Sequence, residues 1–416
     1  MAIVSERGYE NATVTQLVSR AGVSRASFYE HFVSKEACFL VALEDVERDV
    51  LDAVTRGIDA QPRQPPAVAA IAALAQFAHE HPMRAGVLMN ATMAAGPLAL
   101  AARDRGVDAI ARLVEDGSRQ AGASSRAPAL SRAVLIGTAY RLLGSRLRRG
   151  NRERDAARAD LLDWMAAYED PAGEACWQSL TVLPAQAQAP LLARAPLRAP
   201  RALSPGRPRR STPAVAENHR LRIIFATAEI TRRDGYPAAS VAEITRAAGV
   251  DSSVFYKLFS DKHGAFGALR EFAFQQAMAV TAGAFFAVED WPRRIWEAAR
   301  ALTLFLEQNP ALTYACVVES DAGGPETVQR FEDLVAGCTI FLQEGYRYQP
   351  SASASPPSGV VLDAIAQAEL ELIYGQARRG SSSDMAALVG QLAYICLAPF
   401  VGAAGAAELI DAMGRS

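Results

Sequence analysis

The sequence has few cysteines and no excess of basic charge. Its five cysteines are scattered over 416 residues without a CxxC pair, which argues against a disulfide scaffold or a zinc finger and suits a reducing cytosol. A formal net charge of −2 excludes a uniformly basic nucleic-acid coat, so any contact with nucleic acid must come from local patches. Glu6 and Arg7 precede any apolar run at the N-terminus, so no signal peptide is expected.

One stretch is long and apolar enough to raise the question of a membrane span. Residues 385–407 carry no charged side chain. They are rich in alanine and glycine and include Gln391 and Pro399, whereas a strong transmembrane helix depends on Leu, Ile and Phe. We therefore expect two buried helices of an interface, broken near the proline.

The chain contains an internal repeat. Residues 8–39 match residues 235–266 without a gap, and 12 of the 32 aligned pairs are identical. Weaker parallels follow in the same order: 74–77 with 302–305, 115–117 with 343–345, and 148–150 with 378–380. A shared order with small drifts in spacing predicts a duplication of the whole unit, giving a copy one and a copy two.

Proline-rich segments interrupt an otherwise helical pattern. Residues 190–213 hold six prolines, six arginines and no acidic residue, which predicts an extended, semi-rigid linker. Its arginines can contact phosphates, but a solvated, self-repelling spacer is the simpler interpretation. Residues 349–359 form a second low-complexity break. The rest is rich in alanine and leucine at helical spacing and predicts an all-α fold.

The repeated segment has the local signals of two short helices joined by a tight turn. Residues 13–16 (TVTQ) fit a capping box, Gly22 suits the positive φ of a helix stop, and Ser24 caps the next helix. Phe28 and Phe32, at i and i+4, hold that second helix against the first. Copy two repeats these features at residues 240–243, Gly249, Asp251, Phe255 and Phe259. This pattern predicts a helix-turn-helix, whose second helix enters a major groove.

The exposed side of that second helix carries side chains that can donate hydrogen bonds to bases or phosphates. In copy one they are Arg25, Ser27, Tyr29 and His31, and in copy two Ser252, Ser253, Tyr256 and Lys257. Lys35 and Lys262 open the following helix and are placed to reach the DNA backbone.

With these motifs in place, both segments resemble the N-terminal DNA-binding region of TetR-type transcriptional regulators, in the order G-Y, T/S-V, AGV, FY, F and K. The resemblance implies two tandem all-α units, each a helix-turn-helix domain followed by a helical ligand-binding and dimerisation domain. It also implies a cytoplasmic, nucleoid-associated bacterial repressor that binds a double-stranded DNA operator and responds to a small-molecule effector. The expected domains are 1–47, helix-turn-helix with a truncated first helix; 48–176, helical regulatory domain; 177–216, linker; 217–270, second helix-turn-helix; and 271–416, second regulatory domain.

Two departures from the family pattern keep an alternative open. Copy one begins only seven residues before Gly8, whereas copy two has a full preceding helix at about residues 217–233. Residues 1–45 also hold six acidic residues against four basic ones. The alternative is a helical sensor or interaction protein that keeps the fold but has lost DNA binding in copy one or in both copies.

No catalytic set, metal site or cofactor site is expected. His79 and His81 are at i and i+2 and point to different helix faces, and Gly402 and Gly405 lack the preceding strand of a dinucleotide-binding loop. Seven aromatic residues are either core or pocket-lining: Trp164, Tyr168, Trp291, Trp296, Phe305, Tyr314 and Tyr374.

The two copies are expected to pair as an intramolecular pseudo-dimer, in which residues 385–407 face residues 133–168. The recognition helices would then lie in successive major grooves, about 34–36 Å apart. The rival is a homodimer of chains with four helix-turn-helix modules.

Overall fold

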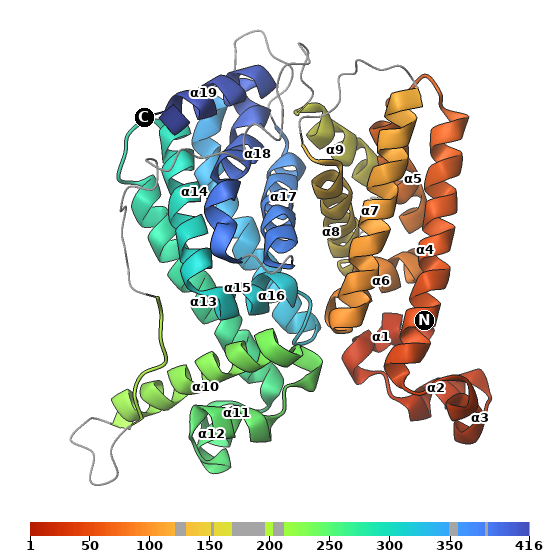
Figure 1. Ribbon diagram of the computed structural model, residues 1–416, viewed down its shortest axis with the longest axis vertical. Helices are drawn as coiled ribbons and strands as arrows, with labels where there is room; N and C mark the ends of the chain where they lie inside the picture. The colour runs from red at the N-terminus through yellow and green to blue at the C-terminus, as the bar shows by residue number, and fades with distance from the viewer. Residues whose placement is uncertain are drawn as a thin grey trace.

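The computed structural model describes residues 1–120, 130–150, 154–168, 196–202, 212–348, 357–378 and 382–415. These residues form helices and connecting loops, with no strand among them, so the all-α expectation is confirmed. Figure 1 shows two helical bundles side by side, each with a helix-turn-helix unit at the same end of the molecule. We call residues 1–168 the first half and residues 212–415 the second half.

The two halves run through similar elements in the same order. The first half contains α1 (Ala2–Asn11), α2 (Val14–Ala21), α3 (Arg25–His31), α4 (Lys35–Ala60), α5 (Pro66–Glu80), α6 (Pro82–Met89), η1 (Ala91–Ala94), α7 (Pro97–Gln120), α8 (Arg132–Arg148) and α9 (Arg154–Ala166). The second contains α10 (Thr212–Asp234), η4 (Tyr236–Ala238), α11 (Val241–Ala248), α12 (Ser252–Leu258), α13 (Lys262–Phe285), α14 (Trp291–Gln308), α15 (Pro310–Thr313), η5 (Tyr314–Val318), α16 (Pro325–Gly337), η6 (Cys338–Tyr348), α17 (Gly359–Arg378), η7 (Ser382–Leu388), α18 (Val389–Val401) and α19 (Ala403–Arg415). By position, α1–α4 correspond to α10–α13, and α8 corresponds to α17.

A long helix in each half connects the helix-turn-helix unit to the bundle. Along α4 the buried residues recur every three or four positions: Phe39, Leu43, Val46, Val50 and Val54. This spacing places them on one face of the helix, which packs against α5 and α7. Helix α13 is the equivalent helix of the second half and packs against α14.

Only part of the expected linker lies within the described residues. Residues 196–202 are free of helix and lie along the second half, where Leu197 N donates to Asn309 Oδ1 at 2.9 Å. The amide of Asn218 donates to Arg201 O at 3.2 Å, which holds the segment beside α10. Residues 212–216, which were expected to end the linker, instead form the first turn of α10. The rest of the linker and most of the break at residues 349–359 lie outside the described residues.

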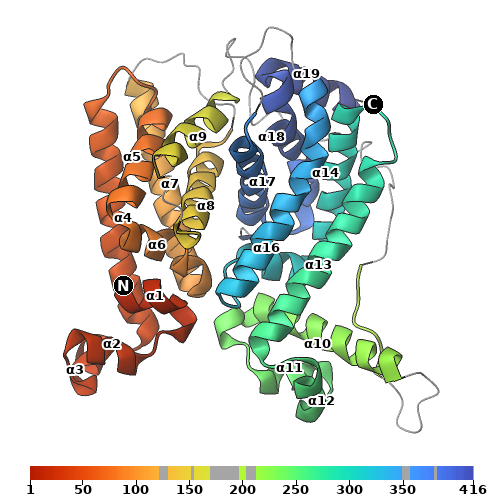
Figure 2. The ribbon, with the colours of Figure 1, turned by 180° about the vertical axis from the view of Figure 1, so that it is seen from behind.

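The halves meet along α8 and α9 on one side and α17 on the other, as Figure 2 shows from behind. The centre of this contact is the buried Glu371 carboxylate of α17. Arg103 donates to Glu371 Oε2 at 2.7 Å and Arg141 Nε donates to the same oxygen at 2.8 Å. Burial would raise the pKa of Glu371, but the two guanidinium groups outweigh burial and lower it. Gly137 of α8 leaves the space that the Glu371 side chain fills, because a Cβ there would overlap it.

A second contact between the halves depends on a proline inside a helix. Pro399 lies within α18 and has no N–H, so the carbonyl of Ile395, four residues earlier, lacks its usual helical donor. The fully buried Tyr168 at the end of the first half supplies one, with its hydroxyl 2.8 Å from Ile395 O. The first half thus satisfies a backbone group that the second half leaves open.

The expectation that residues 385–407 form the second half's share of the interface is corrected by this arrangement. Helix α18 is buried mainly within its own half, against α14, α17 and α19, because it is apolar on all sides. Most of the contact with the first half is made by α17, and α18 adds the contacts of Tyr394 and Ile395 with Tyr168. The break expected near Pro399 falls three residues later, at Gly402, whose φ is +79°. Among the described residues one stretch, Asp384–Val401, is long and apolar enough to cross a membrane, and 72% of it is buried inside the protein.

Candidate nucleic-acid interface

The first helix-turn-helix forms through the local signals of its sequence. The Thr13 hydroxyl accepts from Gln16 N at 3.3 Å and the Gln16 side chain accepts from Thr13 N at 3.0 Å, which confirms the capping box at the start of α2. Gly22 ends α2 with φ +68°, a conformation that glycine adopts without steric cost. The Ser24 hydroxyl then accepts from Ser27 N at 3.0 Å and opens α3.

The second unit repeats this geometry with one difference. Ser240 caps α11 through Glu243, and Gly249 ends that helix with φ +59°. Asp251 occupies the N-cap position of α12 but its side chain makes no capping hydrogen bond. Paired rings hold each recognition helix in place, with centroids 5.4 Å apart for Phe28 and Phe32 and 5.6 Å apart for Phe255 and Phe259.

The side chains that the sequence assigned to DNA lie mostly on the exposed faces of α3 and α12. The exposed ones are Arg25, Tyr29, His31, Ser252, Ser253, Tyr256 and Lys257, and Ser27 is half-buried. Tyr29 is 46% exposed and Tyr256 60% exposed, although both are large aromatic residues. The guanidinium carbon of Arg25 lies 5.8 Å from the centre of the Tyr29 ring. Together these side chains present hydrogen-bond donors at one end of each half.

Lys35 and Lys262 occupy equivalent positions but turn partly toward the protein. The ammonium group of Lys35 donates to Tyr9 O at 2.9 Å and lies 4.1 Å from the centre of the Tyr9 ring. The ammonium group of Lys262 is 3.4 Å from Tyr236 O and 4.5 Å from the centre of that ring. Lys35 therefore connects the first turn of α4 to the end of α1, and Lys262 connects the first turn of α13 to η4. The contact of either lysine with DNA stays a prediction.

The first helices of the two units differ in length and in what they cover. Helix α10 includes the expected residues 217–233, begins earlier, and packs against α11 and α12. There Ile223, Ile230, Ile244, Phe255 and Phe259 form a closed apolar cluster.

Helix α1 is kinked at Gly8 and lies against η1 and α6 of the bundle. Ala21 is exposed and Val23 is 46% exposed, whereas their counterparts Ala248 and Val250 are buried and half-buried. The first unit therefore has the less complete core.

The two DNA-binding units touch each other at a buried carboxylate that the sequence analysis did not single out. Glu10 of α1 lies 3.5 Å from Nδ1 of His263 on α13, and the Tyr236 hydroxyl lies 2.8 Å from the same nitrogen. Burial raises the pKa of Glu10, although Lys262, His263 and Lys35 act to lower it. The repeat of the Gly-Tyr pair at positions 8–9 and 235–236 was the available signal for this region.

One further basic residue also went unnoticed in the sequence. Arg222 of α10 donates to Gly249 O at 3.2 Å, where the turn of the second unit begins. Helix α10 contains several arginines and Arg222 belongs to no motif, so no sequence pattern distinguishes it from the others.

Comparisons with known proteins place this geometry in a defined class. The family model described as "Bacterial regulatory proteins, tetR family" matches residues 1–42 and 223–269, which contain the two helix-turn-helix units. The chain is thus similar, at two places, to the N-terminal region of bacterial regulatory proteins of the tetR family. No curated relative resembles the chain to a significant degree.

Three solved structures align with less than half of the chain. The fatty acid degradation regulator FadR from Bacillus halodurans is 18% identical, with a TM-score of 0.37, over 42% of this chain and 96% of that one. A TetR family transcription regulator from Marinobacter aquaeolei VT8 is 17% identical, with a TM-score of 0.35, over 44% and 96%. A putative TetR-family regulator from Syntrophomonas wolfei str. Goettingen is 19% identical, with a TM-score of 0.36, over 42% and 93%.

Proposed function

We propose that this protein is a ligand-responsive transcriptional repressor of the bacterial cytoplasm that acts through two tandem TetR-like modules on one chain. The observation that carries the proposal is the placement of α3 and α12 at the same end of the molecule (Figure 1), each with exposed hydrogen-bond donors. The recurring order of elements in the two halves supports a tandem duplication. Such a chain would associate with the nucleoid through its operator.

DNA binding is tested by measuring how the affinity for DNA depends on salt concentration and on Lys35 and Lys262. Each phosphate contact contributes about −0.9 to the slope of log K against log salt concentration. Lys35→Ala and Lys262→Ala should weaken binding to all sequences alike and reduce the slope. The control is Arg63→Ala, because Arg63 is exposed beyond the far end of α4. Arg25→Ala should instead change sequence preference. Lysine variants with unchanged affinity and slope would refute the phosphate assignment.

We further propose that one chain acts as the pseudo-dimer, and charge supports this pairing. Helix α8 contains four arginines and no acidic residue, whereas α17 contains three acidic residues and one arginine. Arg141 and Arg148 of α8 bond to carboxylates of the second half, at Glu371 and Asp321 respectively. Pairing α8 with a second copy of itself would bring arginines against arginines, which opposes a homodimer through this face.

The operator of such a pseudo-dimer should be asymmetric. The recognition helices RASFYEH and SSVFYKL share only the Phe-Tyr pair, so they should read unlike half-sites. The mass of the complex with a minimal operator tests the proposal. One chain per operator and an asymmetric footprint are expected, and two chains or a palindromic footprint would contradict it.

The effector is proposed to bind in the second bundle. A cavity of about 180 Å³ lies between α13, α14 and α17 and is lined mostly by apolar side chains. The one acidic residue of its lining is the half-buried Glu369, whose pKa is raised to about 7 by burial. Cys396 Sγ lies 3.2 Å from Glu369 Oε1. This chemistry favours a small apolar molecule with one hydrogen-bond donor for Glu369.

A panel of small apolar amines and alcohols, screened by thermal shift, tests the effector site. A compound that binds should also release the operator. Ala277→Leu narrows the cavity and should abolish both effects while DNA affinity without the compound stays the same, since Ala277 lies far along α13 from the helix-turn-helix. A compound that binds Ala277→Leu equally well would contradict this location.

The second candidate function is a sensor protein whose first unit no longer binds DNA. The exposure of Ala21 and Val23 favours it, because an incomplete core holds α3 less firmly. Replacing Arg25, Tyr29 and His31 by alanine distinguishes the candidates: the loss of half of the footprint supports two working modules, and an unchanged footprint supports the sensor.

A further inference from the structure

A small buried cavity lies where the two halves meet, and its lining is unusually basic. The cavity has a volume of about 30 Å³ and is lined by four arginines, Arg103, Arg141, Arg148 and Arg270, together with Ser320 and two carboxylates. A site that holds one water molecule needs about 10–15 Å³. The cavity can therefore hold a particle somewhat larger than a single water molecule.

Three of these four arginines have their charge compensated by carboxylates. Arg103 and Arg141 share Glu371, and Arg148 bonds to Asp321 and Glu332. The nearby Asp104 lies 3.6 Å from Arg103, and Arg378 binds it at 3.1 Å. Without Arg270, the positive charges of the arginines around the cavity therefore equal the negative charges of the carboxylates.

Arg270 of α13 is the exception. Its side chain is 2% exposed, and none of its three side-chain nitrogens has a hydrogen-bond partner among the described residues. Its guanidinium carbon lies 3.9 Å from the centre of the Phe331 ring, a contact that accepts a cation but satisfies no N–H group. Burial lowers the pKa of Arg270 to about 10, so the side chain stays charged at neutral pH. A buried, unpaired guanidinium is costly for a folded protein.

Other groups at the cavity also have unused donors. One terminal nitrogen of Arg141 and the Nε of Arg148 are buried without a partner among the described residues, against one unused acceptor, Glu332 Oε2. Unused donors therefore outnumber unused acceptors, and one positive charge remains uncompensated. A small anion would correct both imbalances.

We propose that this cavity binds one small monovalent anion, held by Arg270 together with Arg141 and Arg148. Arg270 belongs to the helix that carries the second DNA-binding unit, and the other two belong to α8 of the first half. The anion is therefore a shared ligand that stabilises the contact between the halves. The site is distinct from the effector cavity of about 180 Å³, and its existence does not depend on the proposed function.

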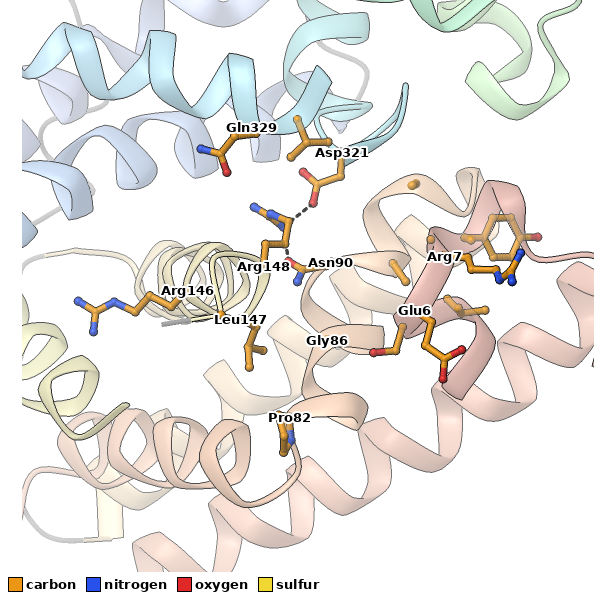
Figure 3. A pocket seen from close by; sticks show the side chains of 18 of the residues that line it. Glu6, Arg7, Pro82, Gly86, Asn90, Arg146, Leu147, Arg148, Asp321 and Gln329 are labelled. Atoms are coloured by element: carbon orange, nitrogen blue, oxygen red, sulfur yellow. Dashed lines mark hydrogen bonds and ion pairs between the residues drawn. The ribbon is translucent and has the colours of Figure 1, made fainter. Parts of the chain in front are cut away.

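The structure provides a route to the site. A groove of about 1010 Å³ runs between the halves beside α1, α6, α8 and α16, and Arg148, Asp321 and Val328 line both the groove and the cavity. Figure 3 shows Arg148 among the side chains that line this groove, directed toward Asp321 and Asn90. An anion from solvent can reach Arg148 without unfolding either half.

The first test uses bromide as the probe, in crystals of the full chain. An anomalous difference peak is expected within hydrogen-bonding distance of the Arg270 guanidinium. A cavity that holds only water or remains empty at saturating bromide would overturn the proposal. This experiment uses the unaltered protein and so does not depend on any variant folding.

The second test compares the melting temperature in potassium chloride and in potassium gluconate at equal ionic strength, because gluconate is too large for the cavity. Chloride at a hundredfold excess over its Kd should raise Tm by about 3 °C, with saturation. Arg270→Met should abolish this chloride-specific rise. Arg330→Met is the control, since Arg330 is 69% exposed and pairs with Glu271, and it should keep the rise.

Two results would overturn the proposal in this second test. One is an equal chloride effect in Arg270→Met, which would mean that ions bind elsewhere. The other is no chloride effect in the unaltered protein. If Arg270→Met does not fold, Arg270→Lys replaces it: one ammonium group offers fewer donors, so a higher chloride concentration should be needed for half of the rise.

Discussion

Replacing Tyr168 by phenylalanine should destabilise the protein because it removes one hydrogen bond that the backbone of α18 cannot replace. The change keeps the ring and its contacts with Trp164 and Tyr394. It deletes the hydroxyl that donates to Ile395 O at 2.8 Å. Pro399 cannot supply a helical N–H, so the carbonyl stays buried and unpaired. A buried acceptor without a partner costs about 1–3 kcal/mol.

A double-mutant cycle isolates this effect from other consequences of the change. Pro399→Ala restores the N–H that α18 lacks, so Ile395 O regains a helical partner. In that background Tyr168→Phe should cost about 1 kcal/mol less than in the unaltered chain. Tyr256→Phe is the control for the loss of a hydroxyl, since Tyr256 is 60% exposed and its replacement should leave stability almost unchanged.

Urea unfolding at equilibrium measures these free energies. Far-UV circular dichroism and tryptophan fluorescence should give coincident curves, because a two-state treatment is valid only then. The reasoning fails if Tyr168→Phe costs the same with and without Pro399. It also fails if the cost in the unaltered chain is no larger than that of Tyr256→Phe.

Three other predictions test the core of the first unit, the centre of the interface and a buried carboxyl group. Hydrogen exchange should be faster in α2 and α3 than in α11 and α12, and equal protection would show that another segment covers the first unit. Gly137→Ala should displace Glu371 from its arginines and cost about 3–5 kcal/mol of unfolding free energy, whereas Gly86→Ala, where an added Cβ meets nothing, should be neutral. Burial raises the pKa of Glu319 to about 7, so its ionisation should destabilise the protein by an amount on the order of 3 kcal/mol as pH rises from about 4.5 to above 7. In unfolding experiments at different pH values, Glu319→Gln should not show this decrease in stability, whereas the control Glu326→Gln, at an exposed position, should still show it.

The helix-turn-helix was predictable because its determinants are local. A capping box and a helix-ending glycine act on backbone groups within about one helical turn, and an i, i+4 ring pair is equally local. The spacing of these residues in the sequence therefore determines their geometry in the structure. Phe28 and Phe32 illustrate this, as does Gly22. Asp251 shows the limit: its residue type suits an N-cap, but its side chain makes no capping hydrogen bond.

Residues that act across the fold were not predictable in the same way. Glu10 and His263 lie 253 positions apart in the sequence, and Arg103 and Glu371 bond over a separation of 268. No periodicity links such residues, because the packing of two bundles brings them together. The contacts of Lys35 with Tyr9 and of Lys262 with Tyr236 were partly predictable. The lysine and the tyrosine both recur in the repeat, but the sequence does not indicate that they contact each other.

The choice of interface helix shows how a correct principle led to the wrong segment. Apolar residues favour burial, so the uncharged residues 385–407 were expected to face the other half. Burial within the second half satisfies the same preference, and a helix that is apolar on every side belongs in a core. The contact between the halves instead uses mainly α17, whose buried Glu371 would be unfavourable without Arg103 and Arg141. The opposite charges of α17 and α8 were therefore the more informative signal, because a buried carboxylate requires a positively charged partner. Helix α8 contains four arginines and no acidic residue.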